Sequence, residues 1–234
     1  YCESFQIQGE HRTGTFTQKI VIPTINAIRK PEALPWEVAG SFGLVSATAL
    51  RMLERARLRR GETVLVVGIG GGVSAAAMHL ALALEAQVFV TSRSPEKIAW
   101  AIEQGAVDGF DSASEFGAEM AKQGGADIVI ESVGPATMRQ SMRAAKRGGR
   151  IAICGATSGA KMELTIPHLF FRQLEMIGSS MGTHSQFARA TEWIGSREAD
   201  SPVAKIFEFE ELPQALAYLD SGEQTGKVVL HHPD

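Results

Sequence analysis

The middle of the chain alternates short apolar runs with amphipathic, helix-like segments. Apolar runs of strand length occupy residues 63–68, 87–91, 127–133 and 150–154. Helix-like runs lie between them, at residues 73–84, 95–104 and 136–147, with a weaker strand–helix pair at 107–123. Because the strands are apolar on both faces, the pattern predicts a buried parallel sheet covered by helices, and right-handed crossovers then give a doubly wound α/β domain. A further strand at 174–180 is expected to extend the sheet.

The first 60 residues follow a different pattern. Residues 15–22 (TFTQKIVI) are rich in β-branched and aromatic side chains, which predicts a strand. Residues 23–35 contain three prolines, which favours a connection over a helix. Within residues 36–60 the apolar side chains recur at helical spacing, and we expect that helix to be interrupted near Gly40 and Gly43.

The pattern changes again after about residue 185. We predict a helix for HSQFARATEWIGS, a strand and a helix ending at Gly222 for KIFEFEELPQALAYLDSG, and a final strand for GKVVL. The two flanks, residues 1–35 and 200–234, are each too small for a core of their own. We therefore expect them to pair as one substrate-side lobe beside a main domain at 36–199.

Composition narrows the possible partners. The chain has 234 residues, 44% of them hydrophobic, and a net charge of -3, which gives no broad attraction to nucleic acid. No apolar run approaches the ~20 residues that a membrane helix needs. Cys2 and Cys154 lie far apart and form no disulfide framework, so a reducing, cytoplasmic compartment is expected. The chain begins at Tyr1 without a signal sequence, and we expect it to be part of a longer protein.

Four glycines in five positions follow the first strand of the predicted sheet: Gly68, Gly70, Gly71 and Gly72. A phosphate can approach a backbone closely only where Cβ atoms are absent, and the N–H groups at a helix N-terminus attract its charge. The strand–glycine–helix order is the context of a dinucleotide fingerprint. Two registers fit, one with Gly70, Gly72 and Ala75 and the other with Gly68, Gly71 and Ser74.

The end of the second strand indicates which dinucleotide. An NAD site usually has an acidic residue there to bind the ribose hydroxyls, whereas this strand ends VTSRSPEK. Arg93 and Lys97 offer cations, and Ser92 and Ser94 offer hydroxyl donors, which suit the 2′-phosphate of NADP(H). The alternative interpretation is an ordinary helix start, with Ser94 as the capping residue and Pro95 after it.

Taken in order, several segments carry a family resemblance. They are GTFTQKIVIP, ATALRML, GETVLVVGIGGGVSAAAMHLA, SRSPEKIAWAIEQGA, ADIVIESVGPATMRQSMRAAKRGGRIAICGATSG and SGEQTGKVVL. This set resembles the medium-chain dehydrogenase/reductase superfamily, in its zinc-type alcohol dehydrogenase and quinone oxidoreductase branches. The resemblance implies a Rossmann domain with remnants of a second, barrel-like catalytic domain, whose N-terminal part is mostly absent here.

The resemblance also implies which residues line the cofactor groove. Besides the residues already named, these are Thr48, Val73, Ser132, Val133, Gly134, Cys154, Gly155, Ala156, Ser179, Ser180, Met181 and Lys227. Residues 179–182 and Lys227 match positions near the nicotinamide half of the cofactor. Ser74 departs from the family's usual glycine and adds a side chain to the loop.

Zinc has less support. The resemblance places Cys2 as the last of four thiolates in a structural zinc loop, and because the other three are not in this chain, structural zinc is possible only in a longer one. Residues 41–49, which match a catalytic ligand segment, contain no Cys, His, Asp or Glu.

The resemblance implies NADP(H)-dependent hydride transfer between the nicotinamide and a carbonyl, enone/quinone or alcohol substrate, with no catalytic residue assigned. Two alternatives remain open: a zinc-dependent alcohol dehydrogenase with ligands before Tyr1, and a non-catalytic NADPH-binding module. A homodimer through residues 174–180 is expected, because an exposed apolar strand invites pairing.

Overall fold

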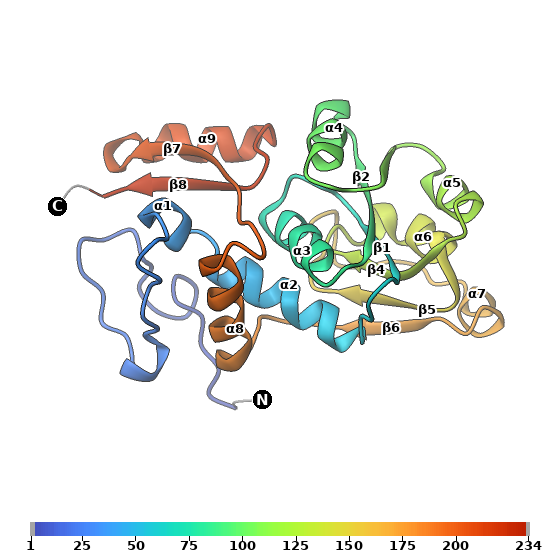
Figure 1. The fold of residues 1–234 in the computed structure, drawn as a ribbon, viewed down its shortest axis with the longest axis horizontal. Helices are drawn as coiled ribbons and strands as arrows, with labels where there is room; N and C mark the ends of the chain where they lie inside the picture. Colours follow the sequence, from blue (N-terminus) through green and yellow to red (C-terminus); the bar gives the residue numbers. More distant parts are fainter. Residues whose placement is uncertain (1–2, 233–234) are drawn as a thin grey trace.

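The computed structural model describes residues 3–232, and a six-stranded parallel sheet forms its centre (Figure 1). The strand order is β3-β2-β1-β4-β5-β6. The strands are β1 (Thr63–Val66), β2 (Gln87–Ser92), β3 (Asp108–Asp111), β4 (Ala126–Glu131), β5 (Ala145–Ile153) and β6 (Glu175–Gly178). The chain order reverses between β1 and β4, so the carboxyl edge of the sheet opens a crevice at that point. The predicted doubly wound α/β fold is confirmed.

Helices cover both faces of this sheet. They are α1 (Trp36–Ala39), α2 (Gly43–Arg55), α3 (Gly72–Ala83), α4 (Pro95–Glu103), α5 (Phe116–Lys122), α6 (Pro135–Ala144), α7 (Ile166–Phe171) and α8 (His184–Gly195). The two cores on either side of the sheet explain why residues 64–67, in and just after β1, are all apolar. Val64 and Val66 join one core with residues of α2, α3 and α8, whereas Leu65 and Val67 join a second core with residues of α5 and α6.

The C-terminal part forms a small separate layer at one end of the molecule. Strands β7 (Val203–Glu208) and β8 (Lys227–His231) pair in parallel, and α9 (Leu212–Ser221) connects them. Gly222 ends α9 in the left-handed conformation, with φ of 70°, which confirms the helix end predicted at this glycine. Figure 1 shows the N-terminal segment at the same end, and α1 contacts β7. The division at 1–35, 36–199 and 200–234 stays a prediction.

Two element predictions are wrong. Residues 15–22 form no strand: Val21 is 95% exposed, and the segment pairs with no other strand of the described chain. Strand propensity has no effect where no partner strand offers hydrogen bonds. The helix expected at 136–147 ends at Ala144, because Ala145 is already extended and pairs with Ala126 as the first residue of β5. Arg172 donates to the carbonyl oxygens of Met142 and Arg143, at 2.9 and 3.2 Å, and so caps the helix end.

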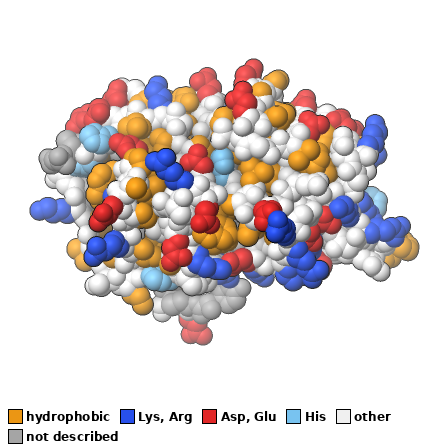
Figure 2. Space-filling model, in the orientation of Figure 1, with side chains coloured by type: hydrophobic (Ala, Val, Ile, Leu, Met, Phe, Trp, Pro, Cys, Tyr) orange, Lys and Arg blue, Asp and Glu red, His pale blue; other side chains and the backbone are white. Residues whose placement is uncertain are grey.

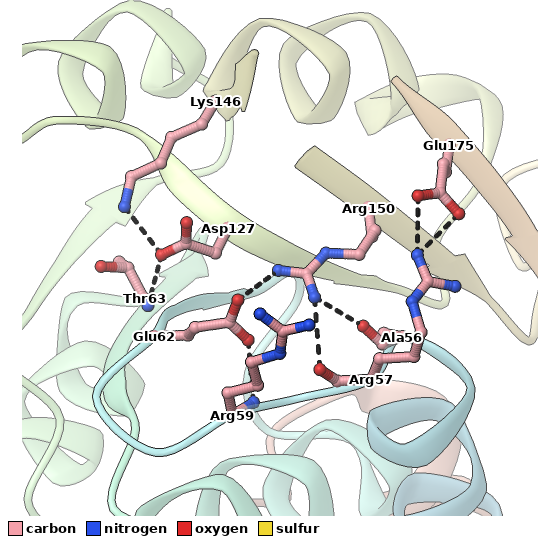
Figure 3. A network of polar contacts seen from close by, with 9 residues as sticks. All are labelled: Ala56, Arg57, Arg59, Glu62, Thr63, Asp127, Lys146, Arg150 and Glu175. Carbon is pink, nitrogen blue, oxygen red and sulfur yellow. Dashed lines mark hydrogen bonds and ion pairs between the residues drawn. The ribbon is translucent and has the colours of Figure 1, made fainter. Parts of the chain in front are cut away.

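A network of ion pairs holds the opposite, amino edge of the sheet (Figure 3). Buried Arg150 of β5 donates to Glu62 at 2.6 Å and to the carbonyl oxygen of Ala56 at 2.9 Å. Asp127 of β4 accepts from the backbone N–H of Thr63 at 2.8 Å. The starts of β1, β4 and β5 are thus tied together, and this edge is occupied by structural contacts.

Charge is unevenly distributed over the surface (Figure 2). In this view acidic side chains lie along the upper edge, over α4 and α9, and Lys and Arg side chains gather at the lower right, near α7. No helix of the described residues is long and apolar enough to cross a membrane.

His79 makes the stability of the fold dependent on pH. Its side chain is buried in α3 against the edge of Trp100, with ring centroids 5.9 Å apart, and Nε2 has no hydrogen-bond partner among the described residues. Burial lowers the pKa of His79 below the ordinary histidine value of about 6.5, and the charge of Asp200 acts in the opposite direction. The folded state therefore binds this proton less readily than the unfolded state does.

We expect the free energy of unfolding to be insensitive to His79 above pH 6.5 and to fall as the pH drops below that value. Chemical denaturation of the wild type and His79→Leu between pH 5 and 8 measures this, and the variant should show the smaller decrease. Identical pH dependence in the two proteins would show that His79 does not titrate differently on folding.

Candidate functional site

The glycine loop between β1 and α3 has the shape of a phosphate cradle. Gly68 and Gly70 have φ of 75° and 119°, in the region that favours glycine. A Cβ atom at Gly68 would lie 2.9 Å from Val133 Cγ2, and one at Gly70 would lie 2.7 Å from Lys97 Cδ. The Ile69 N–H donates to the carbonyl oxygen of Thr91 at 2.7 Å, which fixes the loop to β2.

Helix α3 begins directly at this loop. Gly71 is its N-cap and supplies no side chain to the first N–H groups, which have no partner within the helix. Ser74 does not block the approach. Its buried hydroxyl lies 2.9 Å from the carbonyl oxygens of both Gly68 and Gly71, so the side chain turns inward and braces the loop. The backbone of the loop can therefore accept an anionic group.

A cavity of about 660 Å³ opens beside the loop, at the carboxyl edge of the sheet. Of the residues predicted for the site, it is lined by Gly68, Gly70, Gly71, Ser92, Arg93, Lys97 and Val133. None of the described residues that line it is acidic. Its volume is in the range of small-molecule and cofactor sites.

Two cations stand at the β2 side of this cavity. Arg93 is exposed and has no hydrogen bond or ion pair with the described residues, whereas Lys97 crosses the glycine loop and donates to the carbonyl oxygen of Gly222 at 2.5 Å. Burial lowers the pKa of Lys97, the repulsion from Arg93 lowers it further, and Glu223 opposes both. An anion bound here would relieve the repulsion between the two cations.

The serines beside them have structural partners. Ser94 is the N-cap of α4 and accepts from the backbone N–H of Lys97 at 3.3 Å, with Pro95 at the first helical position. The Ser92 hydroxyl accepts from the Ser94 N–H at 3.1 Å. The capping interpretation is therefore confirmed for Ser94 and Pro95, but it gives Arg93 no role.

The loop after β4 is held by a buried carboxylate. Glu131 is fully buried, and its Oε1 accepts from the N–H groups of Val133 and Gly134 at 2.8 and 3.0 Å. Its Oε2 accepts from the hydroxyls of Thr137 and Ser141 at 2.9 and 2.6 Å. Four donors thus converge on one side chain, which places Val133 against the glycine loop.

The loops after β4 and β5 pack against each other. A Cβ atom at Gly155 would lie 2.7 Å from the Ser132 carbonyl oxygen, and one at Gly134 would lie 3.1 Å from Ala156 Cα. Burial, and then the charge of Glu131, raise the pKa of Cys154 to about 11. The thiol therefore stays protonated at neutral pH and is not poised as a nucleophile.

Other predicted residues lie outside the cavity lining. The Lys227 side chain packs over Gly72 at the start of α3, where a Cβ atom would be 2.8 Å from Lys227 Cδ. Burial lowers the pKa of Lys227, and its ammonium has no acceptor among the described residues. Val73 follows Gly72 in the first turn of α3. Val73 and the Lys227 side chain thus both lie at the N-terminus of α3, next to the N–H groups that have no partner within the helix.

The remaining predicted residues lie by α2. Thr48 donates its hydroxyl to the carbonyl oxygen of Leu44 at 2.7 Å, within its own helix. Ser179 is buried, and its N–H donates to the Ile153 carbonyl oxygen at 2.7 Å. Ser180 and Met181 follow, and Gly182 lies directly against Ala47 of α2.

Sequence reasoning missed part of the lining. The residues it missed are Ile69, Ser112, Ala113, Ala136, Thr137, Thr157, Ser158, Gly222 and Gln224, whereas Ser94, which it named as a donor, also lines the cavity. Ser112 and Ala113 directly follow β3, so the rule that ligands sit beyond the carboxyl ends of strands could have found them. Gly222 and Gln224 reach the site only through tertiary packing and carry no local signal.

Metal ligands do not gather in the described part of the chain. Residues 3–232 contain no group of three or more His, Cys, Asp or Glu side chains placed to hold a metal ion. Cys2, the residue that the resemblance assigned to structural zinc, lies outside the described residues.

Comparison with known proteins gives consistent matches. The family model described as zinc-binding dehydrogenase matches residues 72–196. The chain is 31% identical over 234 residues to a zinc-type alcohol dehydrogenase-like protein of Schizosaccharomyces pombe. That alignment covers 95% of this chain and 67% of the yeast protein. The chain is 29% identical over 231 residues to acryloyl-coenzyme A reductase of Metallosphaera sedula, covering 98% and 69%.

A solved structure of an NAD-dependent alcohol dehydrogenase matches with a TM-score of 0.94 and 32% identity, over 98% of this chain and 68% of that one. The resemblance predicted from the sequence is thereby confirmed. The chain belongs to the zinc-binding dehydrogenase family of the medium-chain dehydrogenase/reductase superfamily, and it is an oxidoreductase that works with a nicotinamide cofactor.

Proposed function

We propose that the cavity binds NADP(H) and that the enzyme transfers hydride between the nicotinamide and a carbonyl, enone/quinone or alcohol substrate. The observation that carries the choice of NADP(H) is the pair Arg93 and Lys97 in a cavity lining without a carboxylate. An NAD site at this position uses an acidic side chain to accept from the ribose hydroxyls. Two cations favour a 2′-phosphate instead.

The chain's own residues bind and orient the cofactor. The N–H groups at the start of α3 suit the pyrophosphate because they have no partner within the helix. The ammonium of Lys227, which the resemblance associated with the nicotinamide half, lies over Gly72 and therefore suits the pyrophosphate as well. Residues 131–134, 154–156 and 179–182 lie farther along the carboxyl edge and suit the nicotinamide side. The bound nicotinamide supplies or accepts the hydride, and the protein contributes position and electrostatics.

Relatives define the candidate substrates. One is named for the reduction of acryloyl-coenzyme A, a conjugated thioester, and another for alcohol dehydrogenase chemistry. Both reactions move a hydride to or from a carbon activated by a carbonyl or hydroxyl group. We therefore propose α,β-unsaturated thioesters together with aldehydes, ketones and quinones as the substrates to screen.

Equilibrium titration of the wild-type chain with NADPH and with NADH tests the cofactor assignment. We expect NADPH to bind at least about tenfold more tightly, because only NADPH has the group that Arg93 and Lys97 can pair with. Equal affinity, or tighter binding of NADH, would contradict the assignment.

We further propose a homodimer through β6 and α7. Within residues 3–232, strand β6 pairs only with β5 and is an edge of the sheet. Beside it Ile166, Phe170 and Phe171 of α7 are 55%, 55% and 68% exposed, and Figure 2 shows hydrophobic side chains at that end of the molecule. Edges of this kind pair readily with a second copy.

Sedimentation velocity at micromolar concentration should show dimers of the wild type. Phe171→Asp should shift the population to monomers, because a carboxylate in an apolar contact is costly to bury. Leu216→Asp, at an exposed position of α9, is the matched control and should stay dimeric. A monomeric wild type would contradict the proposal.

A further inference from the structure

The loop after α9, residues 222–226, lies directly on the glycine loop. The N–H of Gly226 donates to the carbonyl oxygen of Gly70 at 3.0 Å, and Lys97 donates to the carbonyl oxygen of Gly222 at 2.5 Å. Gly226 has φ of 99°, and a Cβ atom there would lie 2.2 Å from the carbonyl oxygen of Pro202. Two hydrogen bonds and a glycine-only turn thus fix this C-terminal loop at the mouth of the cavity.

Gln224 lies between these two anchoring points and lines the cavity. Its Oε1 atom is buried and accepts no hydrogen bond from the described residues. A buried amide oxygen without a donor is unfavourable, so such groups normally have a partner. Among the described residues that line the cavity, the cations nearest in the fold, Lys97 and Arg93, suit phosphate groups.

The chemistry of the cofactor restricts what can donate to this oxygen. Phosphate oxygens are acceptors at neutral pH and cannot donate to an amide oxygen. The adenosine ribose of NADP(H) has its 2′-oxygen phosphorylated and keeps one free hydroxyl, at the 3′ position. That hydroxyl is adjacent to the 2′-phosphate, and therefore adjacent to the group that Arg93 and Lys97 would bind.

We propose that Gln224 accepts a hydrogen bond from the 3′-hydroxyl of the adenosine ribose. The inference rests on the proposed binding of NADP(H) in this cavity, and it makes the C-terminal loop a direct part of cofactor recognition. It also explains why residues 222–226 are held against the glycine loop, since the amide must sit at a fixed distance from the two cations.

Calorimetric titration with adenosine 2′,5′-bisphosphate, which carries this hydroxyl and both phosphates, tests the contact. Gln224→Leu should weaken binding about 5- to 20-fold, the effect of one buried hydrogen bond. NADPH should lose the same factor. Gln214→Leu, an exposed glutamine of α9 in the same part of the molecule, is the control and should bind like the wild type.

The 3′-deoxy form of the bisphosphate isolates the hydroxyl. Wild type and Gln224→Leu should bind it equally, because the proposed partner is missing. Should Gln224→Leu unfold at a much lower temperature than the wild type, Gln224→Asn replaces it, since asparagine keeps the amide but withdraws it by one methylene. Gln224→Asn should likewise bind the bisphosphate more weakly than the wild type does, and should bind the 3′-deoxy form as tightly as the wild type does.

Two outcomes would overturn the inference: bisphosphate binding unchanged in both Gln224 variants, or the same loss with the 3′-deoxy analogue. Either leaves the proposed cofactor intact as long as the wild type binds the bisphosphate and NADPH. A wild type that binds neither ligand contradicts the proposed function itself, and with it this inference.

Discussion

Replacing Arg93 with aspartate is expected to weaken NADPH binding about 100-fold while NADH binding changes by about threefold or less. The guanidinium can form two charge-assisted hydrogen bonds with a 2′-phosphate, and the introduced carboxylate would repel that phosphate. A 100-fold loss corresponds to about 2.7 kcal/mol. NADH lacks the 2′-phosphate, and a carboxylate at this position can accept from its ribose hydroxyls.

Fluorescence or calorimetric titration of both carriers against both proteins measures the change in preference. Arg60→Asp is the matched control, because Arg60 is exposed, pairs with Glu85 near the amino edge of the sheet and alters the net charge equally. It should leave both affinities unchanged. Equal losses of NADPH and NADH in Arg93→Asp would assign Arg93 a structural role and remove the basis for NADP(H).

The second large effect is expected at Glu131. Removing its carboxylate in Glu131→Ala leaves the N–H groups of Val133 and Gly134 and two buried hydroxyls without their acceptor. Hydrogen bonds to a charged group contribute about 1.5–3 kcal/mol each, and buried donors without partners add a further cost. We expect the free energy of unfolding to fall by about 3–5 kcal/mol, which lowers the melting temperature by about 6–20 °C in a chain of this size.

Chemical denaturation, together with a thermal melt, measures this loss. Glu131→Gln should lose less, because its amide oxygen can still accept from the two N–H groups while the hydroxyls reorient. Glu163→Ala, at an exposed position where the side chain forms no hydrogen bond or ion pair with the described residues, should stay within about 0.5 kcal/mol of the wild type. A Glu131→Ala protein as stable as the wild type would contradict the role assigned to the carboxylate.

Local sequence pattern predicted the centre of the sheet well because the inner strands β1, β2 and β4 are buried on both faces. Val64 to Val67 alternate between two cores, so an unbroken apolar run was the correct signature of a parallel strand. The glycine loop was equally predictable, since its positive φ angles and close contacts require glycine. Residues 15–22 failed the same reasoning because a strand also needs a partner, which local sequence does not encode.

Site residues that directly follow a strand could be predicted from the sequence. Site residues that only tertiary packing brings to the cavity could not. Arg93 comes one residue after β2 and was found from position alone. Glu131 lies within the segment ADIVIESVG that carries the family resemblance, but nothing in the sequence shows that four donors converge on its side chain. Gln224 lies more than 150 residues from the glycine loop, and two tertiary hydrogen bonds, from Gly226 to Gly70 and from Lys97 to Gly222, bring it there.

The central claim is that the glycine loop and the cations beside it hold one NADP(H) molecule across the carboxyl edge of the sheet. A crystal structure of the chain grown with NADPH tests this most directly. We predict the pyrophosphate against the N–H groups at the start of α3 and the 2′-phosphate within hydrogen-bond distance of Arg93. Density for NADPH elsewhere, or a glycine loop without bound phosphate at saturating NADPH, would contradict the account.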